Sequence, residues 1–179
     1  MIKDNIVIEG AQLRFKNFSG KAGQFNPEGN RNFCVFLDPE VAEALKQDGW
    51  NIKFLQPRDP DEQPQGYIQV AVAYGNIPPK IILISSRGKT LLDEESVKLL
   101  DWAEMKEVDL IIRPYNWVLH AGTKNERKGV KAYIKSMYVT LHEDEFEKKY
   151  VDVPDSANSA VGGCGECDTC DGSCKCNGD

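Results

Sequence analysis

Apolar and polar residues alternate along two stretches of the chain, Val108–Val118 and Val130–Leu141. Successive side chains of a β-strand point to opposite faces, so this alternation predicts two strands, each with one apolar face. The apolar face of the pair carries aliphatic residues: Leu110, Ile112, Val130, Ala132 and Ile134. The other face carries aromatic and cationic residues: Arg113, Tyr115, Trp117, Lys131, Tyr133 and Lys135.

The two strands are expected to form an antiparallel hairpin with Val118 opposite Val130. This register brings three pairs together: Trp117 with Lys131, Tyr115 with Tyr133, and Arg113 with Lys135. Aromatic rings stack on bases and cations bind phosphates, so this face suits a single nucleic acid strand. The alternative is that the rings form ordinary cross-strand pairs beside solvated lysines.

The segment between the two strands, Leu119–Gly129, is polar and basic and is expected to form the hairpin loop. Three of its cations are candidates for contacts with a phosphate backbone: Lys124, Arg127 and Lys128.

The rest of the chain also favours strands. Apolar or alternating stretches predict five more: Ile6–Phe18, Asn32–Leu37, Trp50–Leu55, Tyr67–Tyr74 and Lys80–Ser85. Asp38 and Pro39 predict the start of a helix that ends before Gly49, and Thr90–Met105 predicts a second helix capped by Asp93. These elements indicate a mainly β protein with two helices, a β-barrel of the OB-fold-like kind whose second helix precedes the last hairpin.

Charge divides the chain into two parts. Residues up to Tyr150 contain 21 Lys and Arg against 22 Asp and Glu, a net charge of −1. From Val151 onward one Lys stands against six acids, a net of −5, which completes the total of −6. We therefore expect a nucleic-acid-binding domain over residues 1–150 and a flexible, acidic, Cys-rich C-terminal tail over residues 151–179. Since the domain is nearly neutral, a basic face on it must be a local patch.

The sequence has no feature of a membrane or secreted protein. No apolar run reaches the length of a membrane span, and the first residues, Met-Ile-Lys-Asp-Asn, do not resemble a signal peptide. We expect a cytoplasmic protein without membrane contact.

Five of the six cysteines lie in the tail, and four of them have the spacing C-x2-C-x2-C-x3-C: Cys164, Cys167, Cys170 and Cys174. In a cytosolic protein such a cluster favours a metal over disulfides, and four thiolates could bind Zn²⁺. The spacing is also that of bacterial ferredoxins, but Lys175 follows where Pro would stand, and the tail offers no shell against solvent. The alternative is a reduced tail that binds no metal.

Several segments carry a resemblance to a known family: Gly29–Asp38, Asp48–Lys53, Gly88–Asp93, Val108–Trp117 and Lys131–Val139. Over roughly residues 5–150 the chain resembles the OB-fold single-stranded DNA-binding proteins of tailed bacteriophages. The resemblance implies binding of single-stranded DNA with little sequence preference, which protects the DNA during phage replication or recombination in the host cytoplasm. It implies neither catalysis nor a required cofactor, and it extends to the six aromatic and cationic residues of the hairpin.

The expected partners are single-stranded DNA and proteins of replication or recombination, and a homodimer is left open. The tail ends in Cys176-Asn-Gly-Asp without a terminal Phe, so recruitment of partners through an aromatic tip is not expected. One competing function is a non-catalytic adaptor whose Cys-rich tail binds a metal. An enzyme is expected least, since the two histidines are far apart in sequence and no carboxylate constellation is evident.

Overall fold

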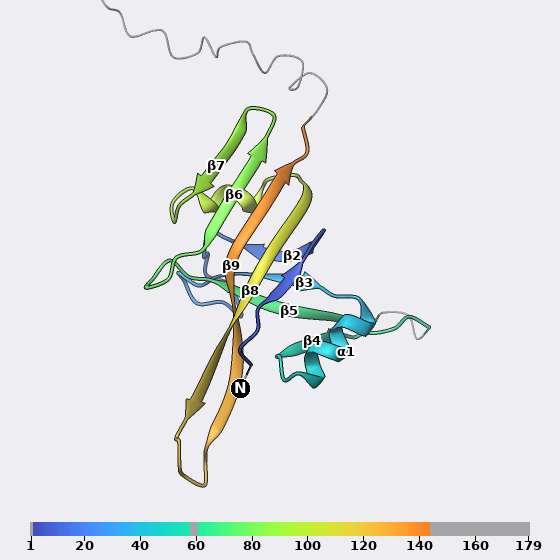
Figure 1. Cartoon of the computed structure of the whole chain (residues 1–179), viewed down its shortest axis with the longest axis vertical. Coiled ribbons are helices and arrows are strands. Elements are labelled where there is room, and N and C mark those ends of the chain that lie inside the picture. The colour runs from blue at the N-terminus through green and yellow to red at the C-terminus, as the bar shows by residue number, and fades with distance from the viewer. Residues whose placement is uncertain (1, 58–60, 144–179) are drawn as a thin grey trace, which may run out of the picture.

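The computed structural model describes residues 2–57 and 61–143, and most of these residues lie in strands (Figure 1). In chain order the elements are β1 (Ile6–Ile8), β2 (Gln12–Asn17), β3 (Arg31–Phe36), α1 (Pro39–Gln47), β4 (Ile52–Leu55), β5 (Gln65–Val72), β6 (Lys80–Ser85), β7 (Gly88–Leu92), the 3₁₀ helix η1 (Val97–Asp101), β8 (Met105–Leu119) and β9 (Arg127–Leu141). The strands of this part of the chain belong to one sheet of nine.

Strand β9 is the centre of that sheet. β8 pairs with it antiparallel along almost its full length. On its other edge β9 pairs in parallel first with β5, at Ala132 and Tyr133, and then with β6, from Ser136 to Thr140. β9 therefore joins a barrel-like lower part, which contains β2, β3 and β5, to an upper part formed by β7, β6, β9 and β8 (Figure 1).

The lower part follows the order β1-β8-β9-β5-β3-β2, so the two ends of the path are consecutive in the chain. The chain turns between them at Gly10, whose φ of 62° lies in the left-handed region that glycine adopts easily. The Gly10 amide donates to Asp109 Oδ1 at 2.9 Å. No ladder joins β1 to β2 among the described residues, so the sheet stays open. A mainly β fold is confirmed, and the open sheet is consistent with an OB-like fold.

The core fills the space enclosed by the inner faces of the strands. Phe18 and Phe33 are fully buried and stack with their ring centres 5.2 Å apart. Apolar side chains from β3, β5, β6, η1, β8 and β9 surround them: Val35, Ile68, Val70, Ile81, Val97, Leu100, Leu110, Ile112, Ile134, Met137 and Val139. In β5 the even-numbered residues face this core, as the alternation predicts. In β9 the even-numbered residues face it up to Ile134, and the odd-numbered residues do so from Met137 onward.

The first helix is confirmed. α1 begins at Pro39 after Asp38 in the N-cap position, and Gly49 follows its end with a φ of 94°. Asp38 occupies the cap in extended conformation, but its side chain makes no capping hydrogen bond.

The prediction of two helices is wrong for the described residues, which contain one α-helix and η1. Thr90 and Leu92 lie in β7, where they pair with Leu83 and Ile81 of β6. Asp93 does accept hydrogen bonds from Glu95 and Ser96, yet these close a turn before five residues of 3₁₀ helix. Asp93 thus makes the hydrogen bonds expected of a helix cap, but the residues before it form strand β7 because they pair with β6.

The predicted hairpin register is also wrong, by two residues. Val118 pairs with Lys128, Trp117 with Gly129 and Tyr115 with Lys131, while Arg113 pairs with Tyr133. A bulge follows, because Ile112 pairs with Ile134 but Ile111 pairs with Ser136, which leaves Lys135 as the extra residue. A shift of two residues keeps each side chain on its face, so the predicted faces survive the error.

The glycine at position 129 explains why this register is preferred. A Cβ added there would lie 2.6 Å from the Trp117 ring, closer than side chains tolerate. The Trp117 ring therefore lies across the strand over a residue that has no side chain. The predicted register would have placed Lys131 at this position.

The predicted boundary at residue 150, the acidic tail and its four candidate metal ligands lie outside the described residues. Within the described part of the chain, no helix is long and apolar enough to cross a membrane.

Candidate nucleic-acid interface

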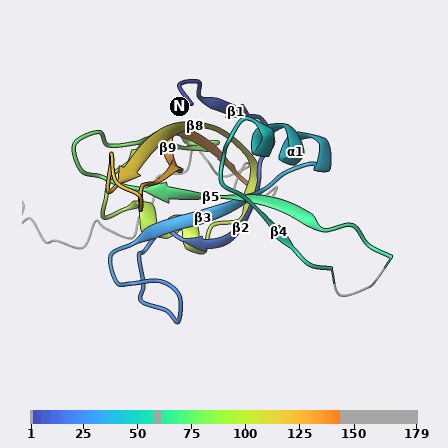
Figure 2. The same cartoon turned by 90° about the horizontal axis from the view of Figure 1, so that it is seen from below.

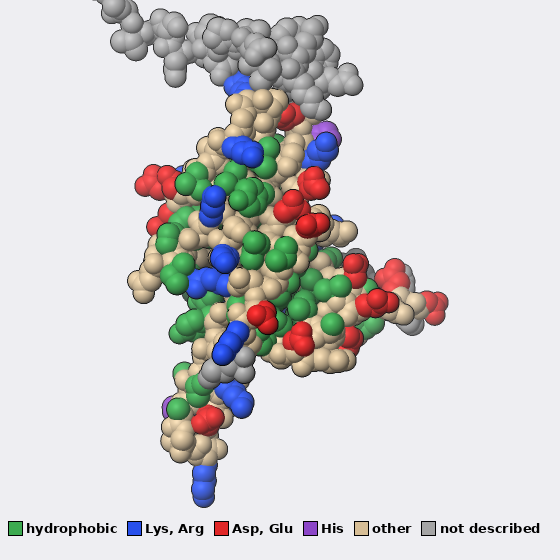
Figure 3. Space-filling model, in the orientation of Figure 1, with side chains coloured by type: hydrophobic (Ala, Val, Ile, Leu, Met, Phe, Trp, Pro, Cys, Tyr) green, Lys and Arg blue, Asp and Glu red, His purple; other side chains and the backbone are tan. Residues whose placement is uncertain are grey.

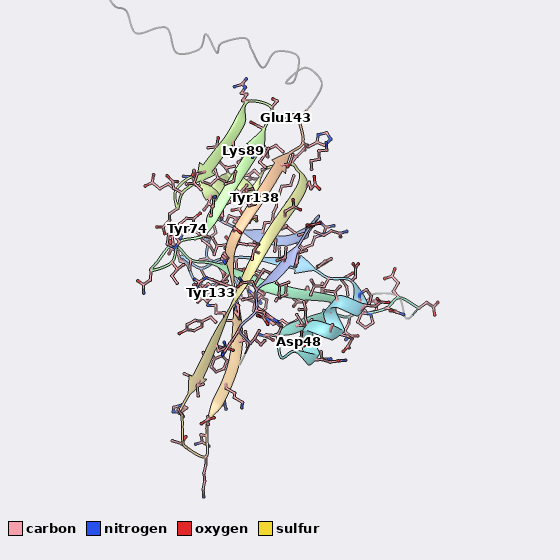
Figure 4. All side chains as sticks on the ribbon, viewed as in Figure 1. Asp48, Tyr74, Lys89, Tyr133, Tyr138 and Glu143 are labelled. Atoms are coloured by element: carbon pink, nitrogen blue, oxygen red, sulfur yellow. The ribbon has the colours of Figure 1, made fainter. Side chains whose placement is uncertain are left out.

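Tyr133 is the centre of a cluster of aromatic and cationic side chains on the β8–β9 hairpin. The guanidinium carbon of Arg113 lies 5.3 Å from the centre of its ring, and Lys131 Nζ lies 5.1 Å from it. The Tyr115 ring meets it edge to face at 5.9 Å. The register produces this cluster, since Arg113 and Lys131 are the residues opposite and beside Tyr133. Figure 4 shows Tyr133 where the long hairpin leaves the rest of the sheet.

Two side chains of this cluster, Tyr115 and Arg113, have groups that a ligand could contact. Tyr115 is 53% exposed, so its ring offers a free face for a base. Arg113 is half-buried, and its Nε has no hydrogen-bond partner among the described residues. A buried donor without a partner is costly, and a phosphate oxygen would satisfy it.

A groove with a volume of about 590 Å³ lies beside this cluster. It runs between the loop before β3, the outer side of β5 and the start of β9, and Figure 2 shows that loop projecting beside β3 and β5. Its floor includes the small side chain of Ala71 on the outer face of β5, which leaves room above the sheet. Aromatic rings line it from several elements: Phe25, Trp50, Tyr74, Trp117 and Tyr133. Amide side chains line it as well: Asn26, Asn30, Asn32, Asn51 and Gln69.

One side chain holds the groove loop in shape. Asn26 Nδ2 donates to the carbonyl oxygens of Lys21, Pro27 and Asn30 at 2.9–3.1 Å. Its Oδ1 accepts from Asn32 Nδ2 at 2.8 Å, which ties the loop to the start of β3. The loop therefore presents Phe25, 92% exposed, on an ordered backbone.

Arg31 and Tyr74 form a second cation–aromatic contact at the groove. The Arg31 guanidinium carbon lies 6.0 Å from the Tyr74 ring centre, and its Nη1 forms an ion pair with Glu94 at 2.9 Å. Burial raises the pKa of Tyr74 to about 12, against the opposing effect of Arg31. Arg31 Nε and the Tyr74 hydroxyl lack hydrogen-bond partners among the described residues. The groove thus holds two further polar groups that a ligand could satisfy.

The structure brings together most, but not all, of the predicted binding residues. Arg113, Tyr115, Lys131 and Tyr133 form the cluster around the Tyr133 ring, and Trp117 lines the groove beside it. Lys135 is exposed at the bulge and does not face Arg113 as predicted.

The three cations assigned to the hairpin loop are spread out. Lys124 is exposed in the loop itself. Arg127 and Lys128 lie within β9, because the strand begins earlier than predicted. Arg127 shares the parity of Lys131 and so lies on the aromatic face, whereas Lys128 lies on the reverse face with Val130.

Sequence reasoning missed Arg31, Tyr74 and the amides of the groove. Arg31 follows the glycine-rich loop directly, which is a usable signal for a phosphate contact. Tyr74 gave no signal, since it continues the alternation of a strand that in fact ends at Val72.

The site has the chemistry of a binding surface. Rings can stack on bases, Arg and Lys can neutralise phosphates, and amides can bond base edges. Among the described residues, no group of three or more His, Cys, Asp or Glu could hold a metal ion.

Comparison with known proteins decides the family. A family model described as a putative phage ssDNA-binding domain matches residues 1–173. The chain belongs to this family. This match confirms the resemblance to phage single-stranded DNA-binding proteins described above.

Similar solved structures include single-stranded DNA-binding proteins of phages, at low sequence identity. One is a single-stranded DNA-binding protein from bacteriophage Enc34 in complex with ssDNA, at 12% identity and a TM-score of 0.49, covering 78% of this chain and 88% of that one. Another is gp2.5, a single-stranded DNA-binding protein encoded by bacteriophage T7, at 8% identity and a TM-score of 0.37, covering 90% and 100%. No curated protein matches the sequence.

Replacing Asn26 tests whether the groove loop is held in advance. Asn26→Ala removes the donor to three carbonyl groups, so we expect faster hydrogen exchange at the Gly29 amide, which donates to Gly20 O at 2.8 Å. Asn76→Ala, in an exposed turn, serves as the matched control and should leave this exchange unchanged. Equal exchange in both variants would show that the loop does not depend on Asn26.

Proposed function

We propose that this member of the phage ssDNA-binding family binds single-stranded DNA through the Tyr133 cluster and the adjoining groove. The observation that supports this most directly is the joining of aromatic rings and cations on one face of the β8–β9 hairpin. Neither feature alone suffices, since rings without cations suit a protein contact and cations without rings suit any polyanion.

Binding would combine two kinds of contact. Bases stack on Tyr115 and Trp117 and, in the groove, on Phe25, while Arg113 and Lys131 bind phosphates. Every base has a flat face, so stacking favours no sequence strongly. The groove amides add hydrogen bonds to base edges, which gives a modest preference at most.

The proposed role is to protect single-stranded DNA during phage replication or recombination in the host cytoplasm, with no catalytic step. The partners would be the DNA itself and proteins of those processes. The adaptor function has no supporting observation in the described residues, because its candidate metal ligands lie outside them.

Removing the stacking rings should weaken binding. Each of Tyr115→Ala and Trp117→Ala is expected to cost about 1–3 kcal/mol in affinity for oligo(dT), since each removes one stacking surface. Fluorescence anisotropy of a labelled oligonucleotide measures the loss, and circular dichroism checks that each variant folds. Trp102→Ala is the matched control, because Trp102 is 81% exposed and does not line the groove.

The tryptophan signal gives an independent reading of the same contact. The chain has three tryptophans, at positions 50, 102 and 117. Quenching by DNA should persist in Trp102→Phe and fall sharply in Trp117→Phe. Affinities that stay unaltered in both alanine variants of the rings would exclude this face.

Two lysines on opposite faces of β9 test the electrostatic part. Lys131→Ala should reduce the slope of log K against log salt by about 1, because one phosphate contact is lost. Lys128→Ala should change the slope less, since Lys128 lies on the reverse face. Titrations with oligo(dT) at several salt concentrations give both slopes. A larger change for Lys128 would place the DNA on the other side of the hairpin.

DNA binding should not depend on a metal. The rings and cations of the proposed site include no metal-ligating cluster, so EDTA should leave the affinity of the full-length protein for oligo(dT) unchanged. Zinc measured by atomic absorption before and after chelation shows whether Cys164, Cys167, Cys170 and Cys174 bind it. If the affinity falls as zinc is removed, and the Cys164→Ser variant behaves the same way, the tail takes part in binding.

A further inference from the structure

The upper part of the sheet has an outer face that carries apolar side chains. The ladders align Leu91, Ile82, Tyr138 and Asp109 in one row across β7, β6, β9 and β8. Leu91 is 65% exposed, and Ile82 and Tyr138 are half-buried. The alternate residues of the same strands point to the core and are almost fully buried: Ile81, Leu92, Met137 and Val139. The outer face is therefore a surface in its own right, of the kind that often marks a protein contact.

Charges of opposite sign flank these apolar residues. The next row runs Lys89, Ile84, Thr140 and Glu107, so a cation stands on β7 and an acid on β8. Lys89 and Glu107 are both exposed, and neither forms an ion pair with another described residue. Figure 3 shows hydrophobic side chains between basic ones over β6 and β7 and acidic ones over β8, and Figure 4 labels Lys89 and Tyr138 on this side.

We propose that this outer face binds a second copy of the chain. A twofold axis that runs along the strands, between β6 and β9 and in the plane of the contact, turns the β7 side of one copy onto the β8 side of the other. Lys89 then faces Glu107 of the second copy, and the symmetry repeats this pair. In the centre, Ile82 faces the second copy's Tyr138, and Ile84 faces its Thr140.

This arrangement follows the usual packing of two sheets. Aligned sheets pack about 10 Å apart with their strands within about 30° of each other. A twofold axis perpendicular to the strands would instead set β7 against β7 and β8 against β8, so Lys89 would have neither Glu107 nor Asp109 opposite it. Of these two orientations, only the axis along the strands sets Lys89 against an acid, and it also sets Leu91 against Asp109 of the second copy.

DNA fits this face less well than a second copy does. Glu107 and Asp109 lie beside Tyr138, where they would repel a phosphate backbone. The rings and cations of the proposed DNA site lie lower on the hairpin, before the bulge at Lys135. The two surfaces can therefore be tested separately.

Sedimentation equilibrium of the full-length protein over a range of concentrations is the test. We expect a monomer–dimer equilibrium. Lys89→Glu and Glu107→Lys should each weaken the dimer by about tenfold or more, because each places like charges opposite one another. The double variant Lys89→Glu/Glu107→Lys restores opposite charges and should regain most of the affinity. Lys98→Glu, exposed on η1 and not in these rows, is the matched control.

Three results would overturn the proposal. One is a protein that stays monomeric at all concentrations up to about 100 μM, since the dissociation constant of any dimer would then lie above that concentration. Another is a dimer that neither charge reversal affects. The third is an unchanged oligomeric state with weaker oligo(dT) binding in Lys89→Glu, which would assign the face to DNA. The first two results do not depend on whether the groove binds DNA, since the variants leave Tyr115, Trp117 and Lys131 intact.

Discussion

The hydrogen bonding of β9 on both edges is the constraint on which the rest of the structure depends. β8 occupies one edge, and β5 and β6 share the other in succession. Because a central strand is fixed on both sides, its residues cannot slip, and the side chains on its outer face keep their positions. Tyr133 and Tyr138 belong to this one strand. The first lies where β5 pairs, beside the groove, and the second lies where β6 pairs, on the upper face.

The bulge at Lys135 lets one strand serve both regions. Before it, odd-numbered residues such as Lys131 and Tyr133 point outward. After it, Tyr138 and Thr140 do so, while Met137 and Val139 turn to the core. The extra residue keeps both halves of the strand in contact with the core despite the change of phase. It also strengthens the local twist, which helps the hairpin to leave the barrel-like part as a separate arm (Figure 1).

Much of this could be predicted from the sequence, and the failures have physical causes. Alternation predicted the faces of the hairpin correctly even though the register was wrong, because period-2 patterns cannot distinguish shifts of two residues. The bulge left a visible trace, since the apolar positions change from even to odd between Ile134 and Met137. The second helix failed because a cap and a turn use the same Asp93 hydrogen bonds, and only pairing with β6 decides between them. The groove could not be predicted, as it joins a loop to strands more than thirty residues away in sequence.

An acidic chain can present a DNA-binding surface if its charges are separated in space, and β8 shows how this is achieved. Its outer face carries Glu107 and Asp109 at one end, and Arg113 with the rings at the other. A strand rises about 3.3 Å per residue, so the distance between the charges at its two ends exceeds the Debye length at physiological salt. The acids at one end therefore do little to weaken phosphate binding at the other. Local charge, and not the net value of −6, decides what each end of this strand can bind.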